Sequence, residues 1–279
     1  MRRPPALRRA YDAYVVAFFL WLALPLVTVS VFAFNDGPFP SPPWQGFTLG
    51  WFLGDGDPWT GLFHERRILA SIWTSVFVAV CVSALAVGVG TTNAFLFNRY
   101  AFRGRGVLYV LMLLPLVIPG IVLGISILVF SSRIANGVQA GTGLYVEALR
   151  PGLPLVIAGQ FSFVATIATL VISARLVKFD RSLEEAALNL GATPLGAVRT
   201  ITLPYLRPAL VGAFVVAFLM SFENFNTTLM LVGSDAPLTI VMFDRLKEGS
   251  TPVLNAVSLL LMVGSGALAL LVIAVQRRD

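Results

Sequence analysis

Charge is scarce in this sequence. Only 12% of its 279 residues are charged, whereas 57% are hydrophobic. A soluble domain usually carries about 25% charged residues, so this composition excludes an ordinary water-soluble protein and indicates that most of the chain lies where charge is costly. Cysteine and histidine each occur once, as Cys81 and His64. A single cysteine excludes an intrachain disulfide, and a lone histidine without partners at ligand spacing is not a metal site.

Catalytic motifs are also absent. No Gly-x4-Gly-Lys-Ser/Thr phosphate-binding loop exists, because the two lysines follow Val177 and Leu246. No Gly-x-Ser-x-Gly nucleophile motif occurs either. The segments between the apolar runs are too short to make a catalytic domain. We therefore predict that the chain is not an enzyme and that it binds no metal or cofactor itself.

Six long apolar runs dominate the sequence. A helix needs about 20 apolar residues to cross the hydrocarbon core of a membrane. Five runs of sufficient length carry no charge, and a sixth carries one carboxylate, Glu223. The predicted spans cover residues 14–34, 68–97, 107–132, 151–174, 208–233 and 252–275. Because backbone polar groups in lipid must be satisfied within their own segment, the spans are predicted to be helices. The predicted fold class is an all-α membrane protein with six transmembrane helices.

The basic residues predict the orientation of these spans. Cytoplasmic segments carry an excess of Lys and Arg. The richer side holds Arg2, Arg3, Arg8, Arg9, Arg99, Arg103, Arg105, Arg175, Lys178, Arg181, Arg199, Arg207, Arg277 and Arg278, and the other side holds Arg66, Arg67, Arg133, Arg150, Arg245 and Lys247. We therefore predict cytoplasmic termini at residues 1–13 and 276–279, with 14–275 as the membrane domain. The first span lacks a small-residue cleavage site and is predicted to remain uncleaved.

The segment 175–207 is the longest on the predicted cytoplasmic side. Ser182, followed three residues later by Glu185, predicts a capping box that opens a short helix. Gly191 suits the left-handed position that ends such a helix, and Thr193-Pro194 predicts the start of a second one. The residues alone leave two interpretations open, an amphipathic connector on the lipid headgroups or a docking element.

This loop carries a long motif. Glu185-Ala186-Ala187 is followed by three residues, Gly191, nine residues and Ile201-Thr202-Leu203-Pro204. The pattern resembles, without departure, the EAA signature of ABC importer permeases, and six spans with this loop before the fifth are similar to the type I importer arrangement. The resemblance implies a MetI-like fold and a coupling loop that docks on an ATPase subunit. The implied coupling residues are Glu185, Ala186, Ala187, Gly191, Ile201, Leu203 and Pro204.

The resemblance also implies partners and a location. It predicts a second permease subunit, two ATPase subunits that use ATP and Mg, and a periplasmic or extracellular solute-binding protein. It predicts a multi-pass protein of the bacterial cytoplasmic (inner) membrane. No nucleic-acid partner is expected, because the basic residues lie in short segments between apolar runs and form no water-facing cluster.

Three further segments point to a cargo. Trp44–Thr48, Ser221–Phe225 and Pro252–Ala256 are similar to corresponding segments of the second permease of spermidine/putrescine transporters, which implies a polyamine cargo. Importers of thiamine, ferric iron, phosphonates or opine-like compounds share the scaffold and remain alternatives. A secondary transporter is a further alternative, although that class typically shows inverted repeats and has no reason to carry an EAA loop.

Glu223 is the single charged residue within the predicted spans. A carboxylate at that depth is costly unless it faces a cavity or a partner. On a continuous helix Asn226 and Thr227 would share its face, and Phe222 and Phe225 flank it. This surrounding suits a cationic amine, through ion pairing and cation–π contact. We hypothesise that these five residues line the translocation path; the alternative is a structural pair with an Arg or with a polar group of the partner permease.

Two other features within the spans have open interpretations. Gln160 in the fourth span either faces the path or makes a hydrogen bond between helices. Pro115 and Pro119 predict a kink in the third span.

Overall fold

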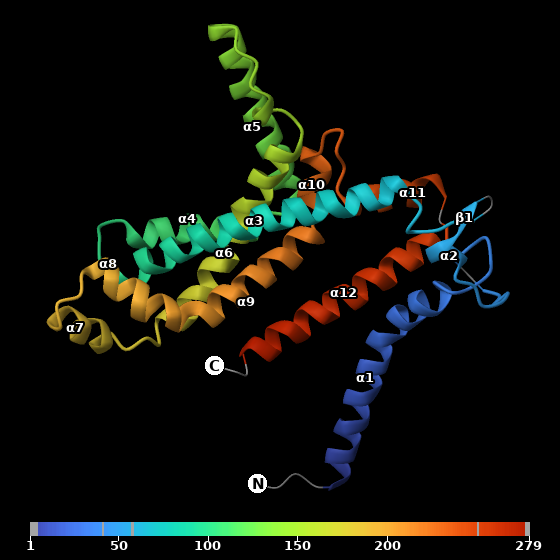
Figure 1. The fold of residues 1–279 in the computed structure, drawn as a ribbon, viewed down its shortest axis with the longest axis horizontal. Coiled ribbons are helices and arrows are strands. Elements are labelled where there is room, and N and C mark those ends of the chain that lie inside the picture. The colour runs from blue at the N-terminus through green and yellow to red at the C-terminus, as the bar shows by residue number, and fades with distance from the viewer. Residues whose placement is uncertain (1–4, 41, 57–58, 250, 277–279) are drawn as a thin grey trace. The chain divides into compact units, whose positions relative to one another are not determined.

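The computed structural model describes residues 5–40, 42–56, 59–249 and 251–276, and it is predominantly helical (Figure 1). In chain order its elements are α1 Pro5–Phe32, α2 Gly50–Leu53, β1 Asp55–Gly56, β2 Trp59–Thr60, α3 Arg66–Arg99, α4 Arg105–Val117, α5 Gly120–Thr142, η1 Glu147–Leu149, α6 Leu153–Leu176, α7 Ser182–Asn189, α8 Pro194–Ala197, the π-helical turn η2 Val198–Thr202, α9 Leu203–Phe222, α10 Asn226–Leu231, α11 Leu238–Glu248 and α12 Val253–Gln276. Six helical segments among the described residues are long and apolar enough to cross a membrane, which confirms the predicted number of spans.

The chain divides into two units, and each is described by itself. The first comprises residues 1–69 and 242–265. Its extramembrane part is organised by aromatic side chains: the Phe34 ring stacks on the rings of Phe47 and Phe52, with centroids 5.4 and 5.3 Å apart. The buried Trp51 donates its Nε1–H to the Asn35 carbonyl at 2.8 Å. These contacts order the segment that follows α1.

A short hairpin and two ion pairs complete the first unit. Strands β1 and β2 pair antiparallel, with Asp55 opposite Thr60. Arg245 pairs with Glu65, and Arg67 lies 3.8 Å from Asp244. Both pairs therefore join α11 to the segment that opens α3.

The second unit comprises residues 70–241 and 266–279. Helix α6 lies at its centre, in contact with α4, α5, α9 and α10. Its sequence explains this position, because apolar or small residues are buried on all sides of it. They include Leu155, Val156, Gly159, Val164, Ala165, Ala168 and Ile172. A helix that is apolar all round is a buried one, and the core of the unit forms around it.

Close approach between α3 and α6 depends on one glycine. A Cβ atom placed on Gly90 would lie 2.9 Å from the backbone nitrogen of Thr169 and 3.0 Å from the Cβ of Ala168. A Cβ atom placed on Gly88, two residues earlier on the same helix, would have no atom within 4 Å. The two helices therefore pack backbone to backbone at Gly90, as small residues permit in membrane bundles.

Two predicted spans are wrong in their boundaries. The predicted third span, 107–132, is split: α4 ends at Val117, α5 begins at Gly120 and runs to Thr142, and Pro119 caps its start in an extended conformation. The predicted kink at Pro119 is thus a break, because proline cannot donate the hydrogen bond that would continue the helix. The predicted fifth span, 208–233, begins earlier and is also broken, since α9 covers Leu203–Phe222 and α10 restarts at Asn226.

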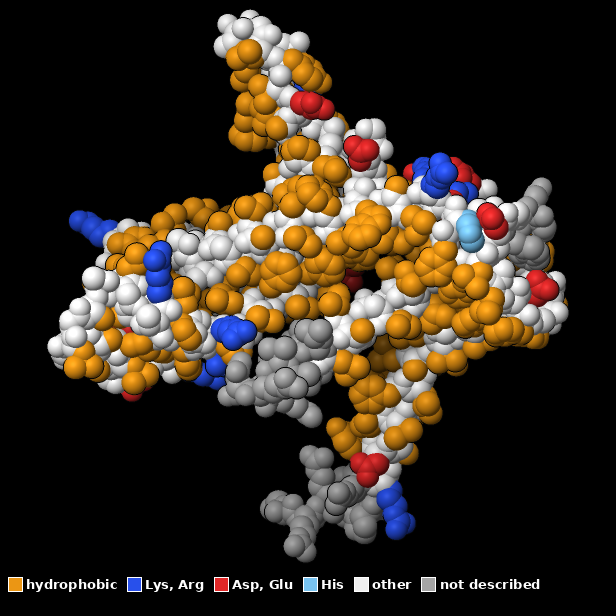
Figure 2. Space-filling view, viewed as in Figure 1, with side chains coloured by type: hydrophobic (Ala, Val, Ile, Leu, Met, Phe, Trp, Pro, Cys, Tyr) orange, Lys and Arg blue, Asp and Glu red, His pale blue; other side chains and the backbone are white. Residues whose placement is uncertain are grey.

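The helices of the second unit present apolar side chains outward (Figure 2). Exposed examples include Trp73, Phe77, Val117, Phe130 and Val216. Soluble proteins rarely expose apolar surface on this scale. Lipid or neighbouring subunits must therefore cover it.

Candidate functional site

The coupling loop folds into two short helices, as the sequence predicts, although one cap differs. Helix α7 is followed by Gly191 at φ +89°, which confirms the left-handed position. Thr193 Oγ1 accepts the backbone N–H of Gly196 at 3.1 Å and caps α8. The predicted capping box at Ser182 is wrong. Ser182 lies inside the first turn, and its backbone N–H is bound by Asp180 Oδ1 at 3.0 Å.

The motif residues differ in exposure. Glu185, Ala186, Gly191 and Pro204 are exposed, whereas Ala187, Ile201 and Leu203 are half-buried. Pro204 lies in the first turn of α9, where its missing N–H removes no helical hydrogen bond. The exposed residues of α7 therefore form a surface outside the packed bundle, at the start of the α8–η2–α9 run (Figure 1).

An ion pair that no sequence pattern indicates holds this loop. Arg99, the last residue of α3, donates from both terminal nitrogens to the carboxylate of Glu184, with Nη2 3.0 Å from Oε1. Thr202 donates its hydroxyl to the same Oε1, and Arg181 donates to the carbonyl of Asn98 at 2.7 Å. We call Asn98, Arg99, Arg181, Glu184 and Thr202 the loop joint.

Aromatic rings surround the joint. The Arg99 guanidinium lies 5.3 Å from the ring centroid of Phe95 and 5.5 Å from that of Phe179. Phe179 in turn packs edge-on against Tyr205 at 5.1 Å, and Arg175 donates to the Tyr205 carbonyl at 2.7 Å. The side chains of Arg99 and Glu184 are only 14% and 13% exposed. The pair is therefore largely shielded from water. In such surroundings charge-assisted hydrogen bonds are stronger than at an exposed surface.

The joint keeps its carboxylate ionised. Burial raises the pKa of Glu184, but hydrogen bonds from Arg99 and Thr202, together with the charges of Arg99 and Arg181, outweigh it and leave the pKa below its usual value. Because the folded-state pKa is lowered, the stabilisation by Glu184 is fully present above its unfolded pKa and is lost as the pH falls through the folded pKa. The backbone and side-chain hydrogen bonds of Ser182 likewise lower the pKa of Asp180, against weak desolvation.

The break in the fifth span is braced by a polar network around Gln160. Gln160 is 1% exposed; its Nε2 donates to Thr228 Oγ1 at 2.8 Å and its Oε1 accepts the hydroxyl of Ser221. Asn224 Oδ1 accepts the backbone N–H and hydroxyl of Thr228 at 3.2 and 3.0 Å. Gln160 therefore makes hydrogen bonds between helices, which was one of its two predicted roles, and does not face an open path within this chain.

The predicted path residues separate into two groups. Glu223 directly follows α9 and is exposed, and the nearby Phe222 and Phe225 are half-buried. Thr227 is 1% exposed and donates to the Gly120 carbonyl at 3.3 Å. The expectation that Glu223, Asn226 and Thr227 share one helix face is wrong, because the helix ends at Phe222. Asn226 begins α10 and is exposed.

Glu223 makes no ion pair or hydrogen bond through its carboxylate with any residue in the described part of the chain. The predicted alternative of a structural pair with an Arg is therefore not formed among those residues. A pair with a partner subunit remains the other alternative.

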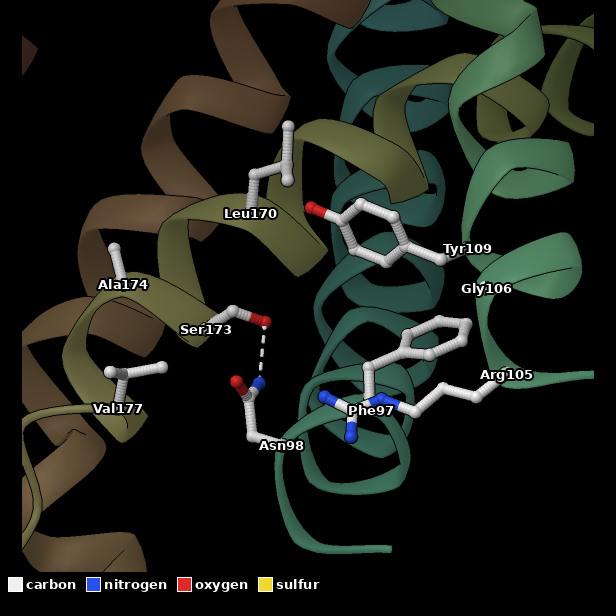
Figure 3. A pocket seen from close by; sticks show the side chains of 9 residues that line it. All are labelled: Phe97, Asn98, Arg105, Gly106, Tyr109, Leu170, Ser173, Ala174 and Val177. Atoms are coloured by element: carbon white, nitrogen blue, oxygen red, sulfur yellow. Dashed lines mark hydrogen bonds between the residues drawn. The ribbon is translucent and has the colours of Figure 1, made fainter. Parts of the chain in front are cut away.

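A cavity lies elsewhere in the second unit, beside the loop joint (Figure 3). It has a volume of about 670 Å³ and is lined by Phe97, Asn98, Arg105, Gly106, Tyr109, Leu170, Ser173, Ala174 and Val177. Of these lining residues, Asn98 donates from Nδ2 to Ser173 Oγ at 3.1 Å. None of the predicted path residues lines it, so this cavity beside the loop joint is distinct from the predicted path.

Comparison with known proteins decides the family. Residues 84–278 match the family described as "Binding-protein-dependent transport system inner membrane component". The chain belongs to this family. It is a permease subunit of an ABC transporter, not an enzyme, and a multi-pass protein of the bacterial inner membrane, as predicted.

Relatives span nearly the whole of this permease. The putrescine transport system permease protein PotI of Escherichia coli K12 is 27% identical over 95% of this chain and 90% of its own length. The spermidine/putrescine permease PotC of Escherichia coli K12 is 29% identical over 90% and 87%. PotC of Haemophilus influenzae is 26% identical over 96% of both chains.

Solved structures share the fold. A bacterial ABC transporter that imports the acidic polysaccharide alginate matches with a TM-score of 0.75 at 18% identity, covering 98% of this chain and 95% of that one. The methionine transporter MetNI matches with a TM-score of 0.56 at 18% identity, covering 76% and 94%. These matches confirm the predicted type I, MetI-like permease fold.

Gly191 provides a local test of the permease loop. Replacement with Ala forces a Cβ onto φ +89° although nothing lies within 4 Å of it, so strain in the left-handed region should destabilise α7 by about 1 kcal/mol. Protease resistance of the loop should fall, as measured by limited proteolysis. Gly106→Ala, in α4 with equally open space, is the control and should leave the cleavage rate unchanged.

Proposed function

We propose that this permease is one of two in an ATP-driven importer whose cargo is a polyamine such as putrescine or spermidine. Glu223 carries the proposal. Its carboxylate is exposed at the break after α9, the described residues supply it with no partner, and the rings of Phe222 and Phe225 lie beside it in sequence. An unpaired carboxylate between aromatic residues attracts a cationic amine. The putrescine and spermidine/putrescine permeases among its relatives support this cargo class.

The coupling loop is the proposed contact with the ATPase. The motif residues Glu185, Ala186 and Gly191 are exposed on α7 and at its end, where a partner can reach them. ATP and Mg bind to two separate ATPase subunits, and their closure pushes on α7. The bundle then exchanges between inward-facing and outward-facing states, an equilibrium that ATP biases. A second permease completes the path, and an external solute-binding protein docks on residues 35–67 and 232–251.

Orientation remains part of the proposal. The excess of basic residues on one side supports cytoplasmic termini and a cytoplasmic α7. Glu223, at the far end of α9 from the coupling loop, then lies toward the external side. Cargo released by the binding protein would meet this carboxylate before it passes the bundle.

Uptake measurements test the cargo. Vesicles that contain the whole complex should accumulate radiolabelled putrescine or spermidine when ATP is supplied, and Glu223→Gln should lower uptake about tenfold or more, since a bond to a charged group contributes about 1.5–3 kcal/mol. Asp12→Asn, an exposed acid in α1, is the matched control and should leave uptake unchanged. If the wild-type complex moves neither amine, the polyamine cargo is wrong and another solute must be sought.

A further inference from the structure

Two adjacent glutamates on α7 have opposite surroundings. Glu185 belongs to the motif and is exposed. Glu184 lies outside the motif, yet its carboxylate is largely buried and receives hydrogen bonds from Arg99 and Thr202. Successive residues on a helix point about 100° apart, so α7 presents one acid outward and one inward.

Glu184 joins three elements of the second unit. Arg99 ends α3, Thr202 directly precedes α9, and Glu184 itself lies in the first turn of α7. Helix α7 is connected to α9 along the chain through α8 and η2. Its connection to α3 is different in kind: Arg99 and Glu184 are 85 residues apart in sequence, so the direct link between α3 and α7 consists of the non-covalent contacts of the loop joint.

The geometry makes this contact stiff. Two terminal nitrogens of Arg99 bind two oxygens of Glu184, and such a bidentate arrangement fixes relative orientation as well as distance. The rings of Phe95 on α3 and of Phe179 between α6 and α7 flank the guanidinium. Arg181 adds a second link through the Asn98 carbonyl.

We propose that Glu184 is a positioning residue that makes α3 follow α7, whereas its neighbour Glu185 faces the partner subunit. This inference rests on the proposed function, in which an ATPase subunit pushes on α7. Loss of the Glu184 charge leaves Arg99 without its partner and frees α7 to move independently of α3. The expected defect lies in the coupling of ATP hydrolysis to transport: the complex still assembles and hydrolyses ATP, but less of that hydrolysis drives uptake.

A distance measurement tests the stiffness directly. Spin labels at Val89→Cys on α3 and Leu190→Cys at the end of α7, both exposed positions, are introduced with Cys81→Ser in the whole complex in nanodiscs. Pulsed electron resonance should give a narrow distance distribution for the parent and for Glu185→Gln. Glu184→Gln should broaden it. If Glu184→Gln leaves the distribution narrow, or if Glu185→Gln broadens it equally, the proposal is overturned.

The ratio of uptake to ATP hydrolysis is a second measurement, and a purely structural role of Glu184 would not change it. Putrescine uptake per ATP hydrolysed should fall about tenfold in Glu184→Gln, within the range of typical coupling energies, with the amount of co-purified ATPase unchanged. Arg99→Gln should have the same effect. The double variant should be no worse than either single one, because contacting residues act non-additively; additive losses would contradict the joint.

The two proposals fail in distinguishable ways. If the wild-type complex moves no putrescine, the cargo assignment fails and the distance distributions alone decide the role of Glu184. If uptake is normal in wild type and in Glu184→Gln, the joint fails and the cargo assignment stands.

Discussion

Replacement of Gly90 with Leu should strongly destabilise the second unit and lower its unfolding midpoint. Even the first carbon of the new side chain would lie 2.9 Å from the Thr169 backbone nitrogen and 3.0 Å from Ala168 Cβ, closer than side-chain atoms normally come. Neither neighbour is the end of a flexible side chain, so α3 and α6 must move apart. Overpacking costs about 1–3 kcal/mol and sometimes more, and backbone contact places this variant at the upper end.

Gly88→Leu is the matched control, because it makes the same change on the same helix. Gly88 is exposed and has open space around it, so its replacement should be neutral or should stabilise α3 by up to about 1 kcal/mol. Thermal unfolding in detergent, monitored by tryptophan fluorescence, gives the unfolding midpoints of both variants. Equal midpoints for the two variants would show that α3 and α6 do not pack at Gly90.

The second large effect is expected at Gln160. Substitution with Leu removes the acceptor of the Ser221 hydroxyl and the donor to Thr228 at a site that is 1% exposed. Each buried polar group left without its partner costs about 1–3 kcal/mol, although partners within membranes often compensate in part. We expect a loss of about 2 kcal/mol of unfolding free energy and uptake reduced by tenfold or more, since α10 is no longer held across the break.

Gln139→Leu separates this effect from the simple loss of an amide. Gln139 is exposed and accepts one bond from Arg150 at 3.0 Å. Its replacement should change neither the unfolding midpoint nor uptake in reconstituted vesicles. A Gln160→Leu variant with wild-type stability and uptake would contradict a bracing role for the network.

The sequence predicts the number of spans and most of the loop because these depend on local signals. Apolar length identifies membrane helices, and Gly191 and Thr193 carry their conformational preferences with them. The break at Pro119 also has a local cause, the missing proline N–H, whereas the break at Glu223 does not. Asn226–Leu231 is as suitable for a continued span as the residues before it, and bonds between distant residues, such as that of Gln160 to Thr228, hold the interruption.

Glu184 illustrates a further limit. A pattern of neighbouring residues cannot tell which of two adjacent glutamates meets an arginine 85 positions earlier in the chain. The motif draws attention to Glu185, and the structure gives the intramolecular bonds to Glu184. The capping box at Ser182 fails for a related reason, since Asp180 is a competing acceptor two residues earlier.

The interrupted fifth span has a consequence for how this protein can exist in a bilayer. Where α9 stops, the Glu223 carboxylate is exposed and no described residue of this chain pairs with it, and hydrocarbon offers a charge no partner in exchange. Acyl chains therefore cannot rest against this point, and either water or another polypeptide must always cover it. A lone copy surrounded by lipid would be poorly solvated there, so insertion and association with a companion chain are thermodynamically linked, and an orphan copy should be a preferred target of membrane proteolysis.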